Sequence, residues 1–281
     1  MVVRMPPPPS ASPPGSPPGP PRLRFEVGSS FAALAIALRR GVAVASIIDL
    51  GCADGLFSVN ARQMAPLANT RILNIDAQAV YEPSLQRIQR ALGGHYRICA
   101  VSDRAATVEL TTATHPYWSS LKPAADDYWR HVEGAARETV PVPARTLDEI
   151  VAETGLPAPH LLKLDIQGSE HAALAAAPRT LAATNIVLVE TFMHEFPGIH
   201  RLLDDAGFDL FDLTALQRGP DHGLSWFYPV YTNRRLNLVA PRPSWAPEDA
   251  ARVLAVQAER RASHLRELDA LLTPIEAAAG R

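Results

Sequence analysis

The sequence predicts an α/β fold in which a mostly parallel sheet carries helices on both faces. From residue 23 onward, short apolar runs alternate with helical stretches, and this alternation is typical of parallel sheets. Runs such as "VASIIDL" (44–50) are apolar at nearly every position, as strands buried on both faces are. With 281 residues, 47% of them hydrophobic, the chain can form one large α/β domain or two small ones.

The expected helices carry start and stop signals. "SSFAALAIALRRG" (29–41) opens with a serine that can cap a helix, and it closes with two arginines and a glycine. "EPSLQRIQRALGG" (82–94) has a proline near its first turn and ends in glycine. The other expected helices are 55–66, 169–182 and 200–208, with a charged helix after residue 245.

The expected strands are apolar runs between these helices. Residues 113–140 are less regular and rich in aromatic side chains, as are residues 226–231, and both segments could cover a pocket or simply pack. The strands are expected at 44–50, 70–76, 96–102, 106–112, 160–166, 185–191, 209–213 and 235–240.

Composition divides the chain into three parts. Residues 1–22 contain ten prolines with glycine and serine, so they cannot bury apolar surface and are expected to be a disordered tail. Residues 23–245 form the expected folded domain. Residues 246–281 form a helical extension, with Leu265, Leu268 and Leu272 on one stripe.

Charge and cysteine content exclude several classes of protein. The net charge of −2 and the pI of about 6.5 offer no basic stripe for nucleic acid. No apolar run reaches the roughly 18 residues of a membrane span, and the N-terminus has no apolar signal-peptide core. Two cysteines make no disulfide framework. We expect a cytoplasmic protein with no nucleic-acid or membrane partner, whose oligomeric state the sequence does not fix.

The stretch "IIDLGCADG" (47–55) joins an apolar strand to a glycine turn. Such a turn places backbone N–H groups and a helix N-terminus beside a ligand. The G-x-G-x-x-G pattern of NAD-binding proteins is absent because Ala53 replaces its second glycine. Asp49 would repel a diphosphate and attract a cation. S-adenosylmethionine, which carries a sulfonium and an ammonium group and no phosphate, suits this pattern best, although a purely structural turn would give the same letters.

Further candidate cofactor ligands follow the next strands. Asp76 ends the second strand, where a carboxylate can accept both ribose hydroxyl protons. Asp103 follows the third strand, where it would either reach the adenine amino group or start a turn. The expected cofactor-binding residues are Asp49, Gly51, Cys52, Ala53, Gly55, Asp76, Ser102 and Asp103.

Several motifs together resemble the FkbM-type family of S-adenosylmethionine-dependent methyltransferases. The matching pieces are "IDLGCADGLFS", "YEPSLQRIQ", "CAVSDRAATVELTT", "VPARTLDEI", "LLKLDIQGSEHAALAAA" and "GFDLFDL", in the family's order across roughly residues 28–240. The most specific is K-x-D-x-x-G-x-E, formed by Lys163, Asp165, Gly168 and Glu170. The glycine loop departs from the family's pattern, since Ala53 stands where asparagine is usual and Asp54 where a small apolar residue is usual.

The resemblance implies a Rossmann-like class I methyltransferase sheet. Such a sheet has seven mostly parallel strands, with an antiparallel last strand inserted between the fifth and sixth. The connection from 209–213 to 235–240 has no obvious helix, which agrees because a parallel crossover usually needs one. The resemblance also implies methylation of a hydroxyl group on a small molecule, a sugar or a natural product.

Methyl transfer to a hydroxyl group needs alignment of the reactants and benefits from a general base. Asp165, directly after the fourth strand, is the first candidate for the base and Glu190 the second; a purely structural role for Asp165 is the alternative. His171 and His194 are weaker candidates. Lys163 shares a strand face with Asp165, so an ion pair between them is expected.

No metal site is expected. The two histidines of "HEFPGIH" (194–200) are six residues apart with a proline between them, unlike zinc ligands that share a helix face.

Two other functions compete with methyl transfer. One is an NAD(P)-dependent oxidoreductase, which the missing glycine and Asp49 disfavour. The other is a non-catalytic Rossmann-like binding protein that would use the proline-rich tail.

Overall fold

The structure is a computed structural model that describes residues 26, 28–113, 119–121, 137–219, 222–239 and 247–278. The chain forms two compact units, residues 1–238 and 239–281. The expected tail at 1–22 lies outside the described residues, as does most of the irregular stretch at 113–140. No helix in the described part of the chain has both the length and the apolar character that crossing a bilayer requires.

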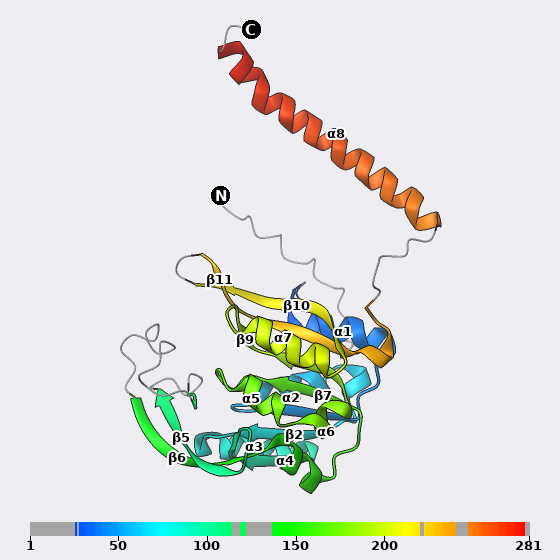
Figure 1. The fold of residues 1–281 in the computed structure, drawn as a ribbon. Helices are drawn as coiled ribbons and strands as arrows, with labels where there is room; N and C mark the ends of the chain where they lie inside the picture. The colour runs from blue at the N-terminus through cyan, green and yellow to red at the C-terminus, as the bar shows by residue number, and fades with distance from the viewer. Residues whose placement is uncertain are drawn as a thin grey trace, which may run out of the picture. The chain divides into compact units, whose positions relative to one another are not determined.

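The first unit is built on one mixed sheet, which confirms the expected α/β class (Figure 1). Its strand order is β10-β11-β8-β7-β1-β2-β3, with β9 paired to β11. β11 runs antiparallel to both of its neighbours, β8 and β10, and the other pairs on this path are parallel. The strands are β1 (Ser46–Leu50), β2 (Arg71–Asp76), β3 (His95–Ile98), β7 (His160–Leu164), β8 (Thr184–Val189), β9 (Thr191–Phe192), β10 (Phe208–Arg218) and β11 (Leu224–Asn233).

The last strand was expected at 235–240, and that position is wrong. β11 comes earlier, at Leu224–Asn233, and Arg234–Leu236 form a 3-10 turn capped by the Asn233 side chain. Proline within an apolar run argues against a strand, so Pro229 masked β11 in the sequence. Pro229 pairs with Leu213 of β10 but lies outside the Val230–Thr232 pairing with β8, so its missing N–H removes no bond on the β8 side.

A second, three-stranded sheet has the order β4-β6-β5. It consists of β4 (Ala100–Val101), β5 (Ala106–Ala113) and β6 (Arg137–Arg145). The expected strand at 96–102 is divided between β3 and β4, in different sheets. β6 was not expected, because Pro141 and Pro143 interrupt its run, yet it pairs with β5 along eight antiparallel residue pairs.

The helices differ from the expectation at four places. The helix expected at 200–208 spans Phe196–Asp205, with a proline in its first turn, and the one expected at 55–66 ends at Arg62. The expected helix at 169–182 is two helices, because Pro178 starts a new one. The helix at 147–154 was not expected, although Thr146 and Glu149 form a capping box that predicts its start. The helices of this unit are α1 (Ser30–Arg39), α2 (Leu56–Arg62), α3 (Glu82–Leu92), α4 (Leu147–Thr154), α5 (Glu170–Ala175), α6 (Pro178–Ala182) and α7 (Phe196–Asp205), with 3-10 turns Ala65–Leu67 and Ala79–Tyr81.

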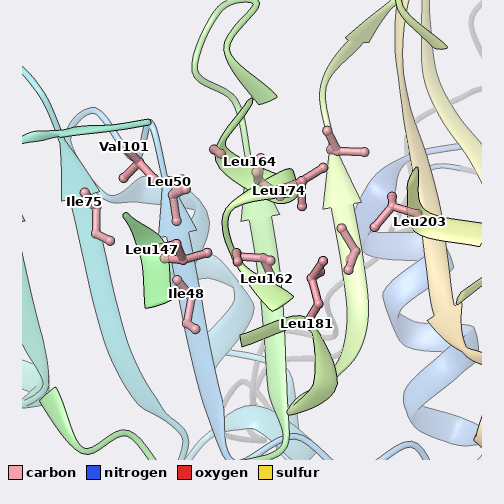
Figure 2. Packing of buried hydrophobic residues seen from close by; sticks show 14 of the residues in the cluster. Ile48, Leu50, Ile75, Val101, Leu147, Leu162, Leu164, Leu174, Leu181 and Leu203 are labelled. Carbon is pink, nitrogen blue, oxygen red and sulfur yellow. The ribbon is translucent and has the colours of Figure 1, made fainter. Parts of the chain in front are cut away.

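The main sheet separates two apolar cores. Alternation along β1 points Ile48 and Leu50 to the side where Leu147 of α4 lies next to them, and the same apolar cluster continues across β7 and β8 to Leu203 of α7 (Figure 2). Ile47 points to the opposite core, under α1 and α2. Asp49 lies on the same face of β1 as Ile47, so its carboxylate is on the side of the sheet that α1 and α2 cover.

The second unit is the helix α8 (Pro247–Ala278), longer than the helix expected after residue 245. Its stripe of Leu265, Leu268 and Leu272 is exposed at 45%, 48% and 39%.

The glycines of the loop after β1 are required by the fold itself. Gly51 has φ +64°, and a Cβ added there would lie 1.8 Å from the carbonyl oxygen of Asp165. Gly55 has φ +76°, and its Cβ would lie 2.5 Å from Cδ1 of Ile88. The pattern D-x-G-x-x-x-G therefore reflects close backbone packing before any ligand is considered.

We expect Gly51→Ala to destabilise the protein by several kcal/mol, because it adds a backbone clash to the roughly 1 kcal/mol cost of a left-handed alanine. Gly41→Ala is the matched control: Gly41 has φ +89° but no atom within 4 Å of an added Cβ. Urea unfolding would measure both variants. Equal losses of stability would contradict the close approach to Asp165.

Candidate functional site

A buried lysine joins the carboxyl ends of β1 and β7. The Lys163 ammonium donates to the carbonyl oxygen of Gly51 at 3.1 Å and lies 3.2 Å from Oδ1 of Asp49. It also lies 3.4 Å from Oδ2 of Asp165, which confirms the ion pair expected from the sequence. Burial alone would lower the pKa of Lys163, but the two carboxylates raise it well above its usual value, so the lysine is charged.

Asp49 is fully buried against this lysine. Its side chain is 0% exposed, and burial raises its pKa while Lys163 opposes the rise. The sequence suggested that Asp49 would attract a cationic ligand directly. Asp49 and Asp165 share the single positive charge of Lys163, so one negative charge remains on this pair and Asp76 adds another.

Asp76 closes the loop after β1. Its Oδ2 accepts from the N–H of Ala53 and its Oδ1 from the N–H of Gln78, each at 2.9 Å. The side chain is buried, which raises its pKa, and the two donors oppose that rise. A carboxylate has about four acceptor positions, so Asp76 keeps capacity for further hydroxyl donors.

The two departures from the family's loop pattern have structural explanations. Ala53 has φ +47°, a left-handed conformation that asparagine adopts more readily than alanine. The hydrogen bond from the Ala53 N–H to Asp76 Oδ2 holds the backbone in this conformation. Asp54 accepts from Ser84 Oγ at 2.7 Å, which ties the loop to α3. Cys52 is buried beside Tyr81, and burial raises the pKa of its thiol well above the usual value.

Ser102 and Asp103 lie after β4, in the smaller sheet. Ser102 Oγ donates to Asp103 Oδ1 at 3.3 Å, and Arg104 pairs with Asp103 Oδ2 at 3.1 Å. The Asp103 side chain is 53% exposed. These contacts are those of an exposed turn, and the contact of Asp103 with the adenine amino group stays a prediction.

Asp165 and Glu190, the two candidate bases, meet beyond β7 and β8. The Gln167 amide donates to Asp165 Oδ1 at 2.9 Å and to Glu190 Oε2 at 2.7 Å. The Tyr228 hydroxyl donates to Asp165 Oδ2 at 2.8 Å and lies 3.2 Å from Glu190 Oε1. We name these four residues the carboxyl cluster.

The two carboxyl groups carry different charges. Burial raises the pKa of Glu190 to about 9, and the neighbouring Asp165 adds to the rise. Burial would also raise the pKa of Asp165, but Lys163 and hydrogen bonds within the cluster lower it overall. At neutral pH Asp165 is therefore ionised and Glu190 is a neutral acid.

Sequence reasoning missed Tyr228 and Gln167. Tyr228 belonged to an aromatic run that could only be described as cover or packing, because β11 itself was not recognised. Gln167 stands inside the K-x-D-x-x-G-x-E motif, which is the one signal that could have identified it. Its φ of +57° is visible only in the structure.

The remaining candidates surround a hollow beside this cluster. Glu170 accepts from the N–H of Ile166 at 2.8 Å and of Gly168 at 2.9 Å, so it braces the loop after β7. Burial raises its pKa to about 7. The hollow, of about 250 Å³, is lined by Gly168, Glu170, His171, His194, Glu195, Gly198 and Ile199. Within the described residues, no group of three or more His, Cys, Asp and Glu could hold a metal ion.

Comparison with known families decides the relationship that the motifs suggested. The model of the methyltransferase FkbM domain matches residues 61–210, more than half of the chain. The chain belongs to the FkbM methyltransferase family. A search of curated protein sequences found no match.

Solved structures similar to this FkbM methyltransferase include other methyltransferases. The FkbM methyltransferase of Methylobacillus flagellatus is 16% identical with a TM-score of 0.41; the match covers 66% of this chain and only 43% of that one. A precorrin-6y C5,15-methyltransferase of Geobacter metallireducens is 12% identical (TM-score 0.38, covering 71% and 85%). A putative tRNA (m1A22) methyltransferase of Streptococcus pneumoniae, solved with S-adenosyl-L-methionine, is 11% identical (TM-score 0.39, covering 86% and 90%).

We expect Lys163→Met to destabilise the protein by roughly 3–5 kcal/mol, because it leaves Asp49 buried without a counter-charge. The double variant Asp49→Asn with Lys163→Met should recover much of this loss, since it removes the buried charge as well. Urea unfolding of both variants tests the pairing. A double variant less stable than the single one would contradict it.

We expect Glu190→Gln to flatten the dependence of stability on pH. Folding raises the pKa of Glu190 from 4.5 to about 9, so its contribution to stability is fully present below about pH 4.5 and is lost as the pH rises toward 9. The variant, which cannot ionise there, should gain on the order of 1–3 kcal/mol over the wild type by about pH 8.

Urea unfolding across this pH range measures the effect. Glu109→Gln, at an exposed position of β5, is the control and should keep the wild-type slope. Parallel slopes for the wild type and Glu190→Gln would show that Glu190 is ionised in the folded protein.

Proposed function

We propose that this FkbM methyltransferase transfers the methyl group of S-adenosylmethionine to a hydroxyl group of a small molecule. The observation that carries the proposal is the pairing of an ionised Asp165 with a neutral Glu190 beyond β7 and β8. Ligands of open α/β sheets bind at this edge. The two free cysteines, both buried, suit a reducing compartment, so a cytoplasmic location is part of the proposal.

The residues present fit S-adenosylmethionine. Asp76 would hold the ribose hydroxyl groups through its remaining acceptor positions, next to the loop that Gly51, Ala53 and Gly55 shape. Lys163 offsets only one of its two carboxylate partners, Asp49 and Asp165, so with Asp76 the edge of the sheet stays negative. That charge favours a sulfonium and an ammonium group and opposes a diphosphate. When bound, S-adenosylmethionine supplies an electrophilic methyl group.

Asp165 is the proposed general base. The acceptor oxygen would bond to the methyl carbon as the carbon–sulfur bond of the cofactor breaks and S-adenosylhomocysteine leaves, and the Asp165 carboxylate would take the proton of the acceptor hydroxyl. Lys163 and Tyr228 hold that carboxylate in place, at 3.4 and 2.8 Å. Glu190 is already protonated and cannot accept the proton, so it is a neutral acid next to the base and not the base itself.

The hollow next to the cluster is the proposed entry for the acceptor. Its Gly168 and Glu170 belong to the segment that directly follows Asp165 and Gln167. Its volume of about 250 Å³ suits a small molecule or one ring of a larger one. His171 and His194 would contact the acceptor there as hydrogen-bonding groups.

Calorimetry separates this proposal from its competitors. We expect micromolar binding of S-adenosylhomocysteine and none of NAD(P). Tight binding of NAD(P) would favour an oxidoreductase, and no binding of either would favour a non-catalytic protein.

A panel of paired hydroxyl and amine acceptors then tests the substrate class. Asp165→Asn should lower the rate with hydroxyl acceptors by about 100-fold or more, far more than it lowers the affinity for S-adenosylhomocysteine.

We expect Asp76→Ala to weaken the binding of S-adenosylhomocysteine about 10- to 150-fold, the range for hydrogen bonds to a charged group. Asp205→Ala, on the exposed end of α7, is the control and should bind as the wild type does. Circular dichroism verifies that both variants are folded. An unchanged affinity in folded Asp76→Ala would remove Asp76 from the cofactor site.

A further inference from the structure

The hydrogen-bond donors around Asp165 and Glu190 are distributed unequally. Asp165 is contacted by three: Gln167 on Oδ1, and Tyr228 together with the Lys163 ammonium on Oδ2. Glu190 receives one amide N–H on Oε2, and no ion pair to it occurs among the described residues. A carboxylate with three donors and a cation is stable as an anion, whereas a buried carboxyl group with one donor is stable only as the acid.

Proton counting locates the acidic hydrogen. The Gln167 amide gives one N–H to Asp165 and the other to Glu190, so Oε2 of Glu190 is an acceptor. The Tyr228 hydroxyl has a single proton, which the shorter contact assigns to Asp165. Oε1 of Glu190 is then the oxygen that carries the acidic proton, and it donates this proton to the Tyr228 oxygen, 3.2 Å away.

We propose that Asp165 and Glu190 form a pair that holds one proton, on Oε1 of Glu190, and that Tyr228 and Gln167 are the positioning residues that keep it there. The inference rests on the proposed function, because it explains how Asp165 stays available as the base. Two carboxyl groups that share the same tyrosine and amide repel each other when both are ionised, and without a fixed donor pattern the proton could move to Asp165 and block it.

Gln167 is itself held in place from outside the cluster. Its backbone has φ +57°, a conformation that a non-glycine residue keeps only when its surroundings enforce it. One contact that supports it comes from Ser120, whose Oγ donates to the Gln167 carbonyl oxygen at 2.6 Å. The same serine pairs with Thr111 of β5 through two backbone bonds of 2.9 Å. The smaller sheet therefore positions the amide that bridges the two carboxyl groups.

Carboxyl carbon NMR of the free protein tests the proposal without any acceptor. With aspartate and glutamate labelled, and Asp165→Asn and Glu190→Gln used for assignment, we expect Glu190 to stay protonated at neutral pH and to titrate at about 9. Asp165 should stay ionised over the same range. Two ionised signals at neutral pH, or a protonated Asp165, would overturn the proposal.

Variants separate positioning from plain structural support. Tyr228→Phe and Gln167→Leu each remove one bond to the Asp165 carboxylate, so each should raise its titration midpoint by about one pH unit. Tyr231→Phe is the matched control, since Tyr231 lies on the same strand and its hydroxyl contacts His200 instead. If neither variant shifts Asp165 further than Tyr231→Phe does, the positioning role is wrong.

Binding of S-adenosylhomocysteine to the same variants keeps the two proposals distinct. If the variants still bind S-adenosylhomocysteine and the titration midpoints of their carboxyl groups are unchanged, the one-proton pair is overturned and the proposed function stands. Shifted titrations in a protein that never binds S-adenosylhomocysteine would support the pair and overturn the proposed function.

Discussion

The ammonium group of Lys163 is the contact on which the rest of the site depends. It is buried and reaches three oxygens, from Asp49, from Gly51 and from Asp165, so it joins the end of β1, the glycine loop and the end of β7. A buried charge needs such a set of partners, because desolvation would otherwise favour its neutral form. The arrangement fixes the spacing of the two strand ends, which in turn lets the Gly51 backbone approach Asp165.

From this contact the charge of the whole edge follows. Lys163 offsets one of the two carboxylates beside it, and Asp76 adds a further negative charge across the loop. The edge of the sheet is thereby suited to a cationic nucleoside and not to a phosphate. Asp165 also gains a fixed counter-ion, which keeps it ionised while its neighbour Glu190 takes up the proton. One buried cation thus separates the roles of two chemically similar side chains.

The antiparallel strand β11 makes the carboxyl cluster possible. A strand beside β8 that runs the other way brings Tyr228, distant in sequence, next to Asp165 and Glu190. The smaller sheet supplies a second distant contact, through the backbone of Gln167. The cluster is therefore assembled from the ends of two parallel strands and the middle of an antiparallel one, and Ser120, bridged to β5 of the smaller sheet, contacts it from outside.

The sequence by itself determined the α/β class, most of the parallel strands, the family and the Lys163–Asp165 ion pair, because these depend on local periodicity and on residues two positions apart. It could not locate β6 or β11, where prolines hide strands that pairing with a neighbour stabilises. Only the tertiary structure decided that Asp49 forms an ion pair with Lys163, and that the loop glycines allow neighbouring segments to pack closely against the loop. It also decided that Tyr228 and Gln167 join the two carboxyl groups. Those outcomes depend on register between strands far apart in the chain, and a single sequence carries no direct record of that register.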